Sequence, residues 1–182
     1  MRLLAISGSL RASSSNTALL RAAALLAPEG VEVVHFDGLG DLPHFNPDLE
    51  DAPIPAVLDF RARLREADGV LISSPEYAHG VPGVLKNALD WVVGSGELVF
   101  KPVALLNASP RSTHAQASLT ETLTVMTAAL VPEASVTVPL AGRKLDAEGI
   151  AADPDLGALL CSAMTGFARA IEARRADSPS PS

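Results

Sequence analysis

The sequence contains few of the residues that mark several classes of protein. It has a single cysteine, which excludes an intrachain disulfide framework and fits a cytosolic protein. Aromatic residues make up only 4% of the chain, so alanine, leucine and valine must form most of the core. No apolar run reaches the ~20 residues that span a bilayer, and the first residues lack a signal-peptide pattern. We therefore expect a cytoplasmic protein with no membrane partner.

Positive charge is also scarce. Lys and Arg number 14 against 21 Asp and Glu, and the formal net charge of −7 argues against a nucleic-acid partner. It does not argue against a local phosphate site, because a loop of backbone N–H groups holds an anion whatever the net charge.

Several catalytic motifs are missing. The sequence has no Gly-Lys-Ser/Thr phosphate loop, no Gly-x-Gly-x-x-Gly fingerprint and no Gly-x-Ser-x-Gly elbow. A Walker-type ATPase, a dinucleotide-binding Rossmann fold and a serine hydrolase are therefore disfavoured. The four histidines have no metal-ligand spacing, so we expect no metal site.

Buried-type strands alternate with amphipathic helices along the chain. We expect strands at 2–7, 31–36, 69–74, 102–107 and 133–138, and helices at 16–27, 55–67, 82–93, 115–130 and from 154 onward. This order is typical of an α/β fold with a parallel sheet. The length of 182 residues fits one domain, expected at 1–175, and a disordered tail is expected at 176–182.

The loop after the first expected strand has the composition of a phosphate site. Residues 8–17 read GSLRASSSNT and combine hydroxyls, backbone amides and the Arg11 guanidinium, with no acid, at the start of a helix. A phosphate monoester binds to such a set of donors. The alternative is an ordinary serine-rich turn that caps the helix.

The loop after the third expected strand suits a flat ring. Residues 75–83 read PEYAHGVPG and offer the Tyr77 ring, the Glu76 carboxylate and several backbone amides. A flavin, which is flat and apolar with a polar edge, needs such a lining. In a doubly wound sheet of order 2-1-3-4-5 the first and third of these loops would meet at one crevice. The alternative for Tyr77 is a half-buried loop aromatic.

The two motifs GSLR-x-x-S-x-N and PEY-x-x-x-x-PG-x-LKNALDW together resemble the NADPH-dependent FMN reductase family, which includes quinone, azo-dye and chromate reductases. The resemblance implies a flavodoxin-like doubly wound five-stranded parallel sheet of order 2-1-3-4-5 with helices on both faces. It also implies FMN as cofactor and NADPH or NADH as hydride donor. The electron acceptor would be a quinone, an azo compound, a metal oxyanion or free flavin.

The resemblance also implies which residues contact the cofactor. The expected phosphate ligands are Ser9, Arg11, Ser15, Asn16 and Thr17. The residues expected at the isoalloxazine and ribityl are Pro75, Glu76, Tyr77, Ala78, His79 and Ser109. Arg111 is the expected contact to the NADPH phosphates. The family commonly has Asn at the position of Ala78, so only a backbone contact is expected there. No side chain is expected to be catalytic, because the chemistry belongs to the flavin.

A homodimer or homotetramer is a further implication of the resemblance, with the helix at 82–93 and the turn at 142–144 near the partner. We expect Trp91 in a core or an interface, and Cys161 as a packed, inert thiol. Two alternatives to the reductase remain. One is a flavodoxin-like electron carrier without NAD(P)H turnover, which the Leu-Lys-Asn-Ala-Leu-Asp-Trp helix disfavours, and the other is a flavin-free α/β domain.

Overall fold

The fold is one parallel sheet covered by helices on both faces. The computed structural model describes residues 1–140 and 142–177. Within them the strands are β1 (Arg2–Ser7), β2 (Glu32–Phe36), β3 (Gly69–Ser73), β4 (Pro102–Leu105) and β5 (Ala129–Leu130). They lie in the order β2-β1-β3-β4-β5, and all neighbours are parallel. The predicted flavodoxin-like order is therefore confirmed.

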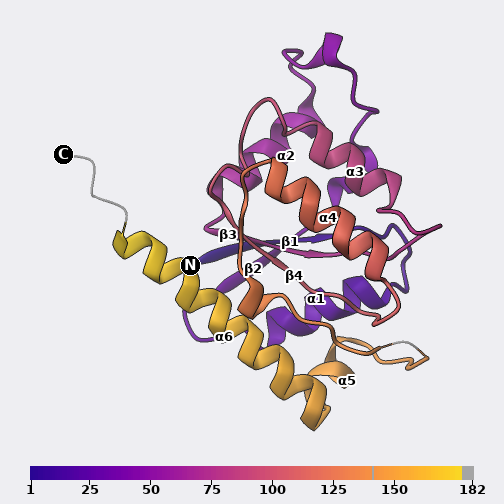
Figure 1. Cartoon of the computed structure of the whole chain (residues 1–182), viewed down its shortest axis with the longest axis vertical. Helices are drawn as coiled ribbons and strands as arrows, with labels where there is room; N and C mark the ends of the chain where they lie inside the picture. The colour runs from indigo at the N-terminus through magenta and orange to yellow at the C-terminus, as the bar shows by residue number, and fades with distance from the viewer. Residues whose placement is uncertain (141, 178–182) are drawn as a thin grey trace.

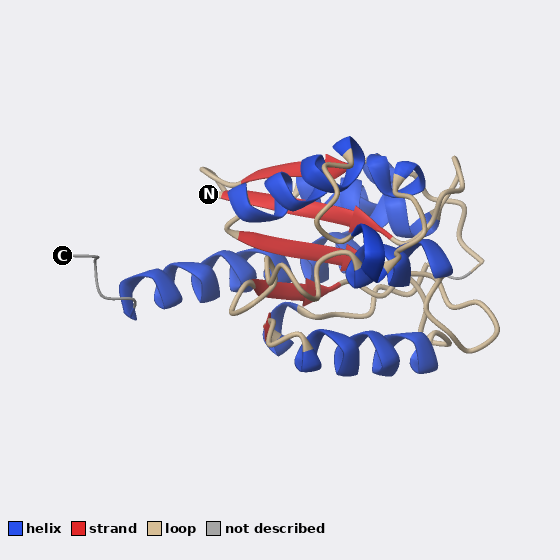
Figure 2. Cartoon of the chain, turned by 90° about the horizontal axis from the view of Figure 1, so that it is seen from above, coloured by secondary structure: helices blue, strands red, loops and turns tan. Residues whose placement is uncertain are grey.

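Six α-helices form the outer layers (Figure 1). The helices α1 (Ser15–Leu25), α5 (Ala147–Ala152) and α6 (Pro154–Asp177) pack on one face of the sheet. The helices α2 (Pro55–Glu66), α3 (Gly83–Asp90) and α4 (Thr113–Val125) pack on the other. Figure 2 shows the sheet between the helices. The central strand β3 is buried along its whole length, and alternate residues contribute to the two cores, Leu71 to one and Val70 and Ile72 to the other.

The prediction for the fifth strand was wrong. Helix α4 ends at Val125, and Thr127 takes a left-handed backbone with φ of 61° that turns the chain into the two-residue β5. The predicted strand at 133–138 begins instead in a 3₁₀ turn, η3 (Pro132–Ala134). Only its second half is extended, and there Thr137 forms a parallel bridge with Asn107 beyond the end of β4.

The C-terminal region differs from the prediction in three respects. The short helix α5 was not expected; Asp146 caps it by accepting a hydrogen bond from the Gly149 N–H at 2.8 Å. In α6, Leu159 is 37% exposed and Cys161 is exposed, so neither is a core residue. Helix α6 also continues through 176 and 177, where a disordered tail was predicted. The rest of that predicted tail, 178–182, lies outside the described residues.

Helix α6 is long and apolar enough to cross a membrane by length and composition alone. Its buried side, which includes Leu160, Met164 and Phe167, packs into the core shared with α1 and the sheet. The helix therefore serves as a core helix of this domain.

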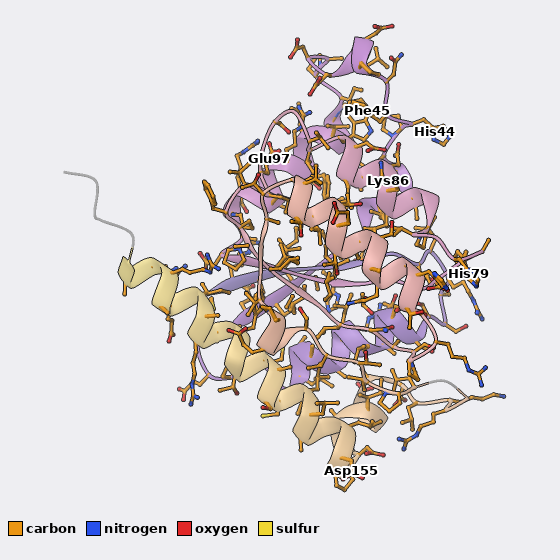
Figure 3. All side chains as sticks on the ribbon, in the orientation of Figure 1. His44, Phe45, His79, Lys86, Glu97 and Asp155 are labelled. Atoms are coloured by element: carbon orange, nitrogen blue, oxygen red, sulfur yellow. The ribbon has the colours of Figure 1, made fainter. Side chains whose placement is uncertain are left out.

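The Leu-Lys-Asn-Ala-Leu-Asp-Trp segment of α3 holds a long loop in place. Asn87 accepts a hydrogen bond from the Phe45 N–H at 2.7 Å and donates one to the Pro43 carbonyl at 2.9 Å. Trp91, which is 1% exposed, donates its indole N–H to the same carbonyl at 2.8 Å. Figure 3 shows Phe45 close to α3, beside Lys86. The motif is therefore structural, as predicted for Trp91.

Candidate active site

Three loops meet at the carboxyl ends of β1, β3 and β4. The Gly8 N–H donates to the Ser73 carbonyl at 2.8 Å, and the Leu106 N–H donates to the Ile72 carbonyl at 2.8 Å. A Cβ atom on Gly8 would lie 2.9 Å from Ser74 Oγ. The loops after β1 and β3 are therefore in direct contact, which only glycine at position 8 permits.

The first loop is ordered by its own hydroxyls. Ser14 caps α1 by accepting from the Thr17 N–H at 3.4 Å, and Thr17 Oγ1 lies 2.8 Å from Ser7 Oγ. The first two N–H groups of the helix, those of Ser15 and Asn16, have no hydrogen-bond partner among residues 1–140 and 142–177. They are the free donors that a helix start presents to an anion.

Asn16 has a structural function as well. Its side chain is buried, and Oδ1 accepts a hydrogen bond from Ser73 Oγ at 2.9 Å. The start of α1 is thereby tied to the end of β3. Neither the backbone N–H nor the side-chain Nδ2 of Asn16 donates to a partner within the described chain.

The third loop turns back on itself in a tight hairpin. The Tyr77 N–H donates to the Gly80 carbonyl at 3.1 Å, and the Gly80 N–H donates to the Tyr77 carbonyl at 2.9 Å. The two residues between them, Ala78 and His79, have φ values of 49° and 61°. This left-handed backbone favours Gly or Asn, so Ala78 holds a strained position.

Glu76 connects the third loop to the fourth. Its Oε2 accepts a hydrogen bond from the Ala115 N–H at 2.8 Å, in the first turn of α4. The residue that precedes this helix, Ser112, makes no side-chain cap of its own. Glu76 therefore caps α4 from a distant part of the chain and places a negative charge at the positive end of the helix.

The fourth loop, residues 106–112 between β4 and α4, is held by a second set of side-chain hydrogen bonds. Asn107 Oδ1 accepts from the Ser109 N–H at 3.1 Å, and Ser109 Oγ accepts from the Arg111 N–H at 3.2 Å. The His79 and His114 rings stack with their centroids 4.1 Å apart and their planes 17° apart. Figure 3 shows His79 at the same edge of the molecule as the first turns of α4.

A cleft of about 410 Å³ lies where the three loops meet. It brings together five of the predicted site residues: Ser15, Asn16, Pro75, Glu76 and Ser109. It is also lined by Ala108, Ser112, Leu140 and Gly142, which sequence reasoning did not place in the site, and by Arg143 and Lys144, which the sequence offers only as candidates for distinguishing NADPH from NADH. The Thr137–Asn107 bridge holds the chain beside the carboxyl end of β4, and the segment at 142–144 follows shortly after it.

The other predicted residues lie around this cleft. Ser9, Arg11 and Thr17 line a smaller cavity of about 200 Å³ on the far side of the first loop, near β2. Tyr77, Ala78 and His79 form the exposed hairpin turn and do not line the cleft. Arg111 is exposed and is likewise not part of the lining.

The electrostatics near the first loop are set by arginines. His35 at β2 lines the cavities beside Arg11 and Arg21. Burial lowers the pKa of His35, and the nearby Arg21 guanidinium lowers it further. A neutral imidazole beside two guanidinium groups is the arrangement expected where the local potential is positive.

Comparison with known proteins assigns the family. The family described as NADPH-dependent FMN reductase matches residues 1–142. The chain belongs to this family. An NAD(P)H-dependent FMN reductase from Pseudomonas aeruginosa is 37% identical over 155 residues, which cover 82% of this chain and 83% of that one. The flavoenzyme NAD(P)H:(acceptor) oxidoreductase FerB from Paracoccus denitrificans is 31% identical, with a TM-score of 0.78 over 94% of this chain and 97% of that one.

Quinone reductases are also similar to this member of the family. The quinone reductase of Escherichia coli is 35% identical over 113 residues, covering 60% of each chain. The chain spans less than two thirds of this relative's length. Together with the match to the FMN reductase family, these findings make the protein an NAD(P)H-dependent oxidoreductase that uses FMN.

The residues of the site fit FMN. The free N–H groups of Ser15 and Asn16, with the exposed Arg11 guanidinium nearby, match a phosphate monoester. No acid occurs in residues 8–17. Pro75, Ala108 and Leu140 give the cleft an apolar part beside its polar residues, and this mixed lining suits a flavin ring with a polar edge.

Proposed function

We propose that this reductase passes electrons from NADPH or NADH, through FMN held between its first, third and fourth loops, to a small-molecule acceptor of the quinone type. The observation that carries the proposal is the single cleft lined by Ser15, Pro75 and Ser109, one residue from each loop. The quinone reductases among the similar proteins support this class of acceptor.

The first loop would bind the phosphate of FMN. The backbone N–H groups of Ser15 and Asn16 are free to donate to the phosphate at the start of α1, and the Arg11 guanidinium supplies positive charge. Ser9 and Thr17 would contribute hydroxyls, although each also holds the loop by a hydrogen bond to a neighbour.

The third and fourth loops would bind the isoalloxazine and the ribityl chain. The Tyr77 N–H is already used by the hairpin, so the N–H groups of Glu76 and Ala78 are the donors left for the ring edge. The Glu76 carboxylate faces α4 and acts by holding the two loops together. Pro75, Ser109 and the exposed Tyr77 and His79 would surround the ring.

FMN, when bound, supplies the hydride and electron chemistry itself. The chain's contribution is to neutralise the phosphate, orient the ring and leave one side open to the nicotinamide and then to the acceptor. Among the described residues that line the cleft the acidic side chain is Glu76, whose Oε2 is bonded to the backbone of α4. We expect solvent to provide the protons that a quinone takes up with two electrons.

We also propose a cytoplasmic homodimer or homotetramer. Four apolar side chains lie exposed after α3 and at the end of α4: Val93, Val99, Phe100 and Val125. Phe100 is 72% exposed, and its N–H bonds to the Thr127 carbonyl at 2.8 Å, which places it near the end of α4. Size-exclusion chromatography with light scattering tests this, and a monomer at micromolar concentration would contradict it.

The test of the proposed function is quinone-dependent oxidation of NADPH by the FMN-loaded protein. We expect steady oxidation with 1,4-benzoquinone, and initial-rate lines that stay parallel as the two substrates are varied, because both use one open site in turn. A protein that retains FMN but oxidises neither NADPH nor NADH would contradict the proposal and point to an electron carrier.

A further inference from the structure

A second and larger cavity, of about 760 Å³, lies between α1 and residues 143–148. We name it the α1–α5 cavity. It shares Ser15, Arg143 and Lys144 with the cleft, so the two spaces adjoin across the 143–144 segment. Its volume lies within the range of pockets that hold small ligands, ~300–1,000 Å³. The flavin assignment uses the edge of this cavity formed by Arg11, Ser15 and Thr17, and it leaves the part toward Arg21 and residues 144–148 without an occupant.

Unpaired positive charge lines the α1–α5 cavity. Arg11, Arg21 and Lys144 form no ion pair with any residue that the structure describes. Arg143 is paired with Asp153 and so holds the 143–148 segment against the start of α6. In a chain with a net charge of −7, three free cations around one cavity indicate a site for an anion.

The acidic residues around the cavity do not cancel this charge. Asp146 accepts a hydrogen bond from the Gly149 N–H and is occupied in capping α5. Glu148 lies in the first turn of α5, so the lining has two carboxylates, those of Asp146 and Glu148, against three free cations. The cavity therefore keeps a net positive charge, and a carboxylate at its edge suits hydroxyl groups of a sugar.

The lining of the cavity also has apolar side chains, those of Ala18, Ala24, Leu25 and Leu145. Three of them lie on α1, as Arg21 does, and Leu25 is 57% exposed. His35 adds a flat ring whose pKa is lowered by burial. A ligand that matches this mixed lining has both a phosphate and a flat, weakly polar ring.

We propose that the α1–α5 cavity binds the adenosine 2′-phosphate end of NADPH and that Arg21 is a determinant of NADPH over NADH. The proposal rests on the proposed function. Arg11 is assigned to the flavin phosphate, which leaves Arg21 and Lys144 for a second phosphate monoester. A guanidinium forms paired hydrogen bonds with such a group. Arg111 lines neither cavity and is the weaker candidate for this phosphate.

The kinetic test compares Arg21→Gln and Arg21→Glu with the unchanged enzyme. Arg21 is exposed on α1, so both variants are expected to fold. We expect the KM for NADPH to rise about tenfold or more in Arg21→Gln, because a hydrogen bond to a charged group is lost. The KM for NADH should change less than about twofold, since NADH has no 2′-phosphate. The matched control is Arg169→Gln on α6, which removes an exposed cation away from the cavity.

A binding test does not depend on activity. Adenosine 2′,5′-bisphosphate and adenosine 5′-monophosphate are titrated into the FMN-loaded protein by calorimetry. We expect the bisphosphate to bind more tightly, and this advantage to disappear in Arg21→Glu but not in Arg169→Gln. Equal binding of the two nucleotides, or an advantage that survives in Arg21→Glu, overturns the proposal.

The two proposals fail in different ways. If the reductase function is wrong, FMN-loaded protein oxidises neither nucleotide, while the titration still decides whether the cavity binds a 2′-phosphate. If only the cavity assignment is wrong, the enzyme oxidises both nucleotides and Arg21→Gln changes their KM values by the same factor.

Discussion

Glu76 is predicted to stabilise α4 and the flavin site together. Its carboxylate accepts from the Ala115 N–H at 2.8 Å, and the helix has no side-chain cap from Ser112. Loss of a cap costs about 0.5–2 kcal/mol of unfolding free energy. The lost charge at the positive helix end adds about 0.3–1 kcal/mol. For Glu76→Ala we therefore expect a total loss of about 1–3 kcal/mol.

Thermal unfolding of the apo-protein, followed by circular dichroism, measures this loss. A domain of this size loses about 2–4 °C of Tm per kcal/mol, so Glu76→Ala should lower Tm by about 2–12 °C. Glu76→Gln keeps an acceptor and should lose about half as much. Glu121→Ala is the control, because Glu121 is an exposed acid on the same helix and caps nothing among the described residues.

The same variant should weaken FMN binding, because the third and fourth loops are no longer tied together. Quenching of FMN fluorescence on titration gives the Kd, which should rise in Glu76→Ala and less in Glu76→Gln. A Glu76→Ala protein with the Tm and the Kd of the Glu121→Ala control would refute this account of Glu76.

Three further predictions concern stability. Gly157→Ala should lower the free energy of unfolding in urea by about 1–3 kcal/mol, because the new Cβ would lie 2.6 Å from the Ala151 carbonyl oxygen. An unchanged free energy of unfolding would contradict this close packing of α5 against α6. Asn87→Ala should cost about 1–3 kcal/mol, since the Phe45 N–H loses its partner while the Pro43 carbonyl keeps the bond from Trp91, and it should speed proteolysis of that loop. His35 has a lowered pKa in the folded state, so unfolded protein takes up protons first as the pH falls below about 6.5. Stability should therefore fall from pH 7.5 toward pH 5, and less steeply in His35→Gln; parallel pH profiles would contradict this.

The central strands could be predicted from the residues and the sheet order from the family resemblance, while the flavin site stays a prediction. Continuous apolar runs mark the central strands, and the loops that follow β1 and β3 carry residue types suited to phosphate and to a flat ring. The short β5 could not be predicted, because Ala129–Leu130 has no periodicity of its own. Its start depends on the left-handed backbone of Thr127, which the sequence does not signal.

The contacts between loops were also beyond sequence reasoning. Glu76 lies 39 residues from the helix it caps, so no local capping pattern exists. Arg143 and Lys144 enter the site through a strand bridge that depends on the fold of η3. In α6 the apolar spacing predicted the core face correctly except at Leu159, which lies beside that face and is partly exposed.

The most direct test of the central claim is the visible spectrum of the purified protein after FMN addition and desalting, followed by anaerobic NADPH. The account predicts that flavin absorbance is retained through desalting and that NADPH bleaches it. Loss of the flavin on desalting, or retained flavin that stays oxidised with both NADPH and NADH, would contradict the claim that the three loops form the flavin site of a reductase.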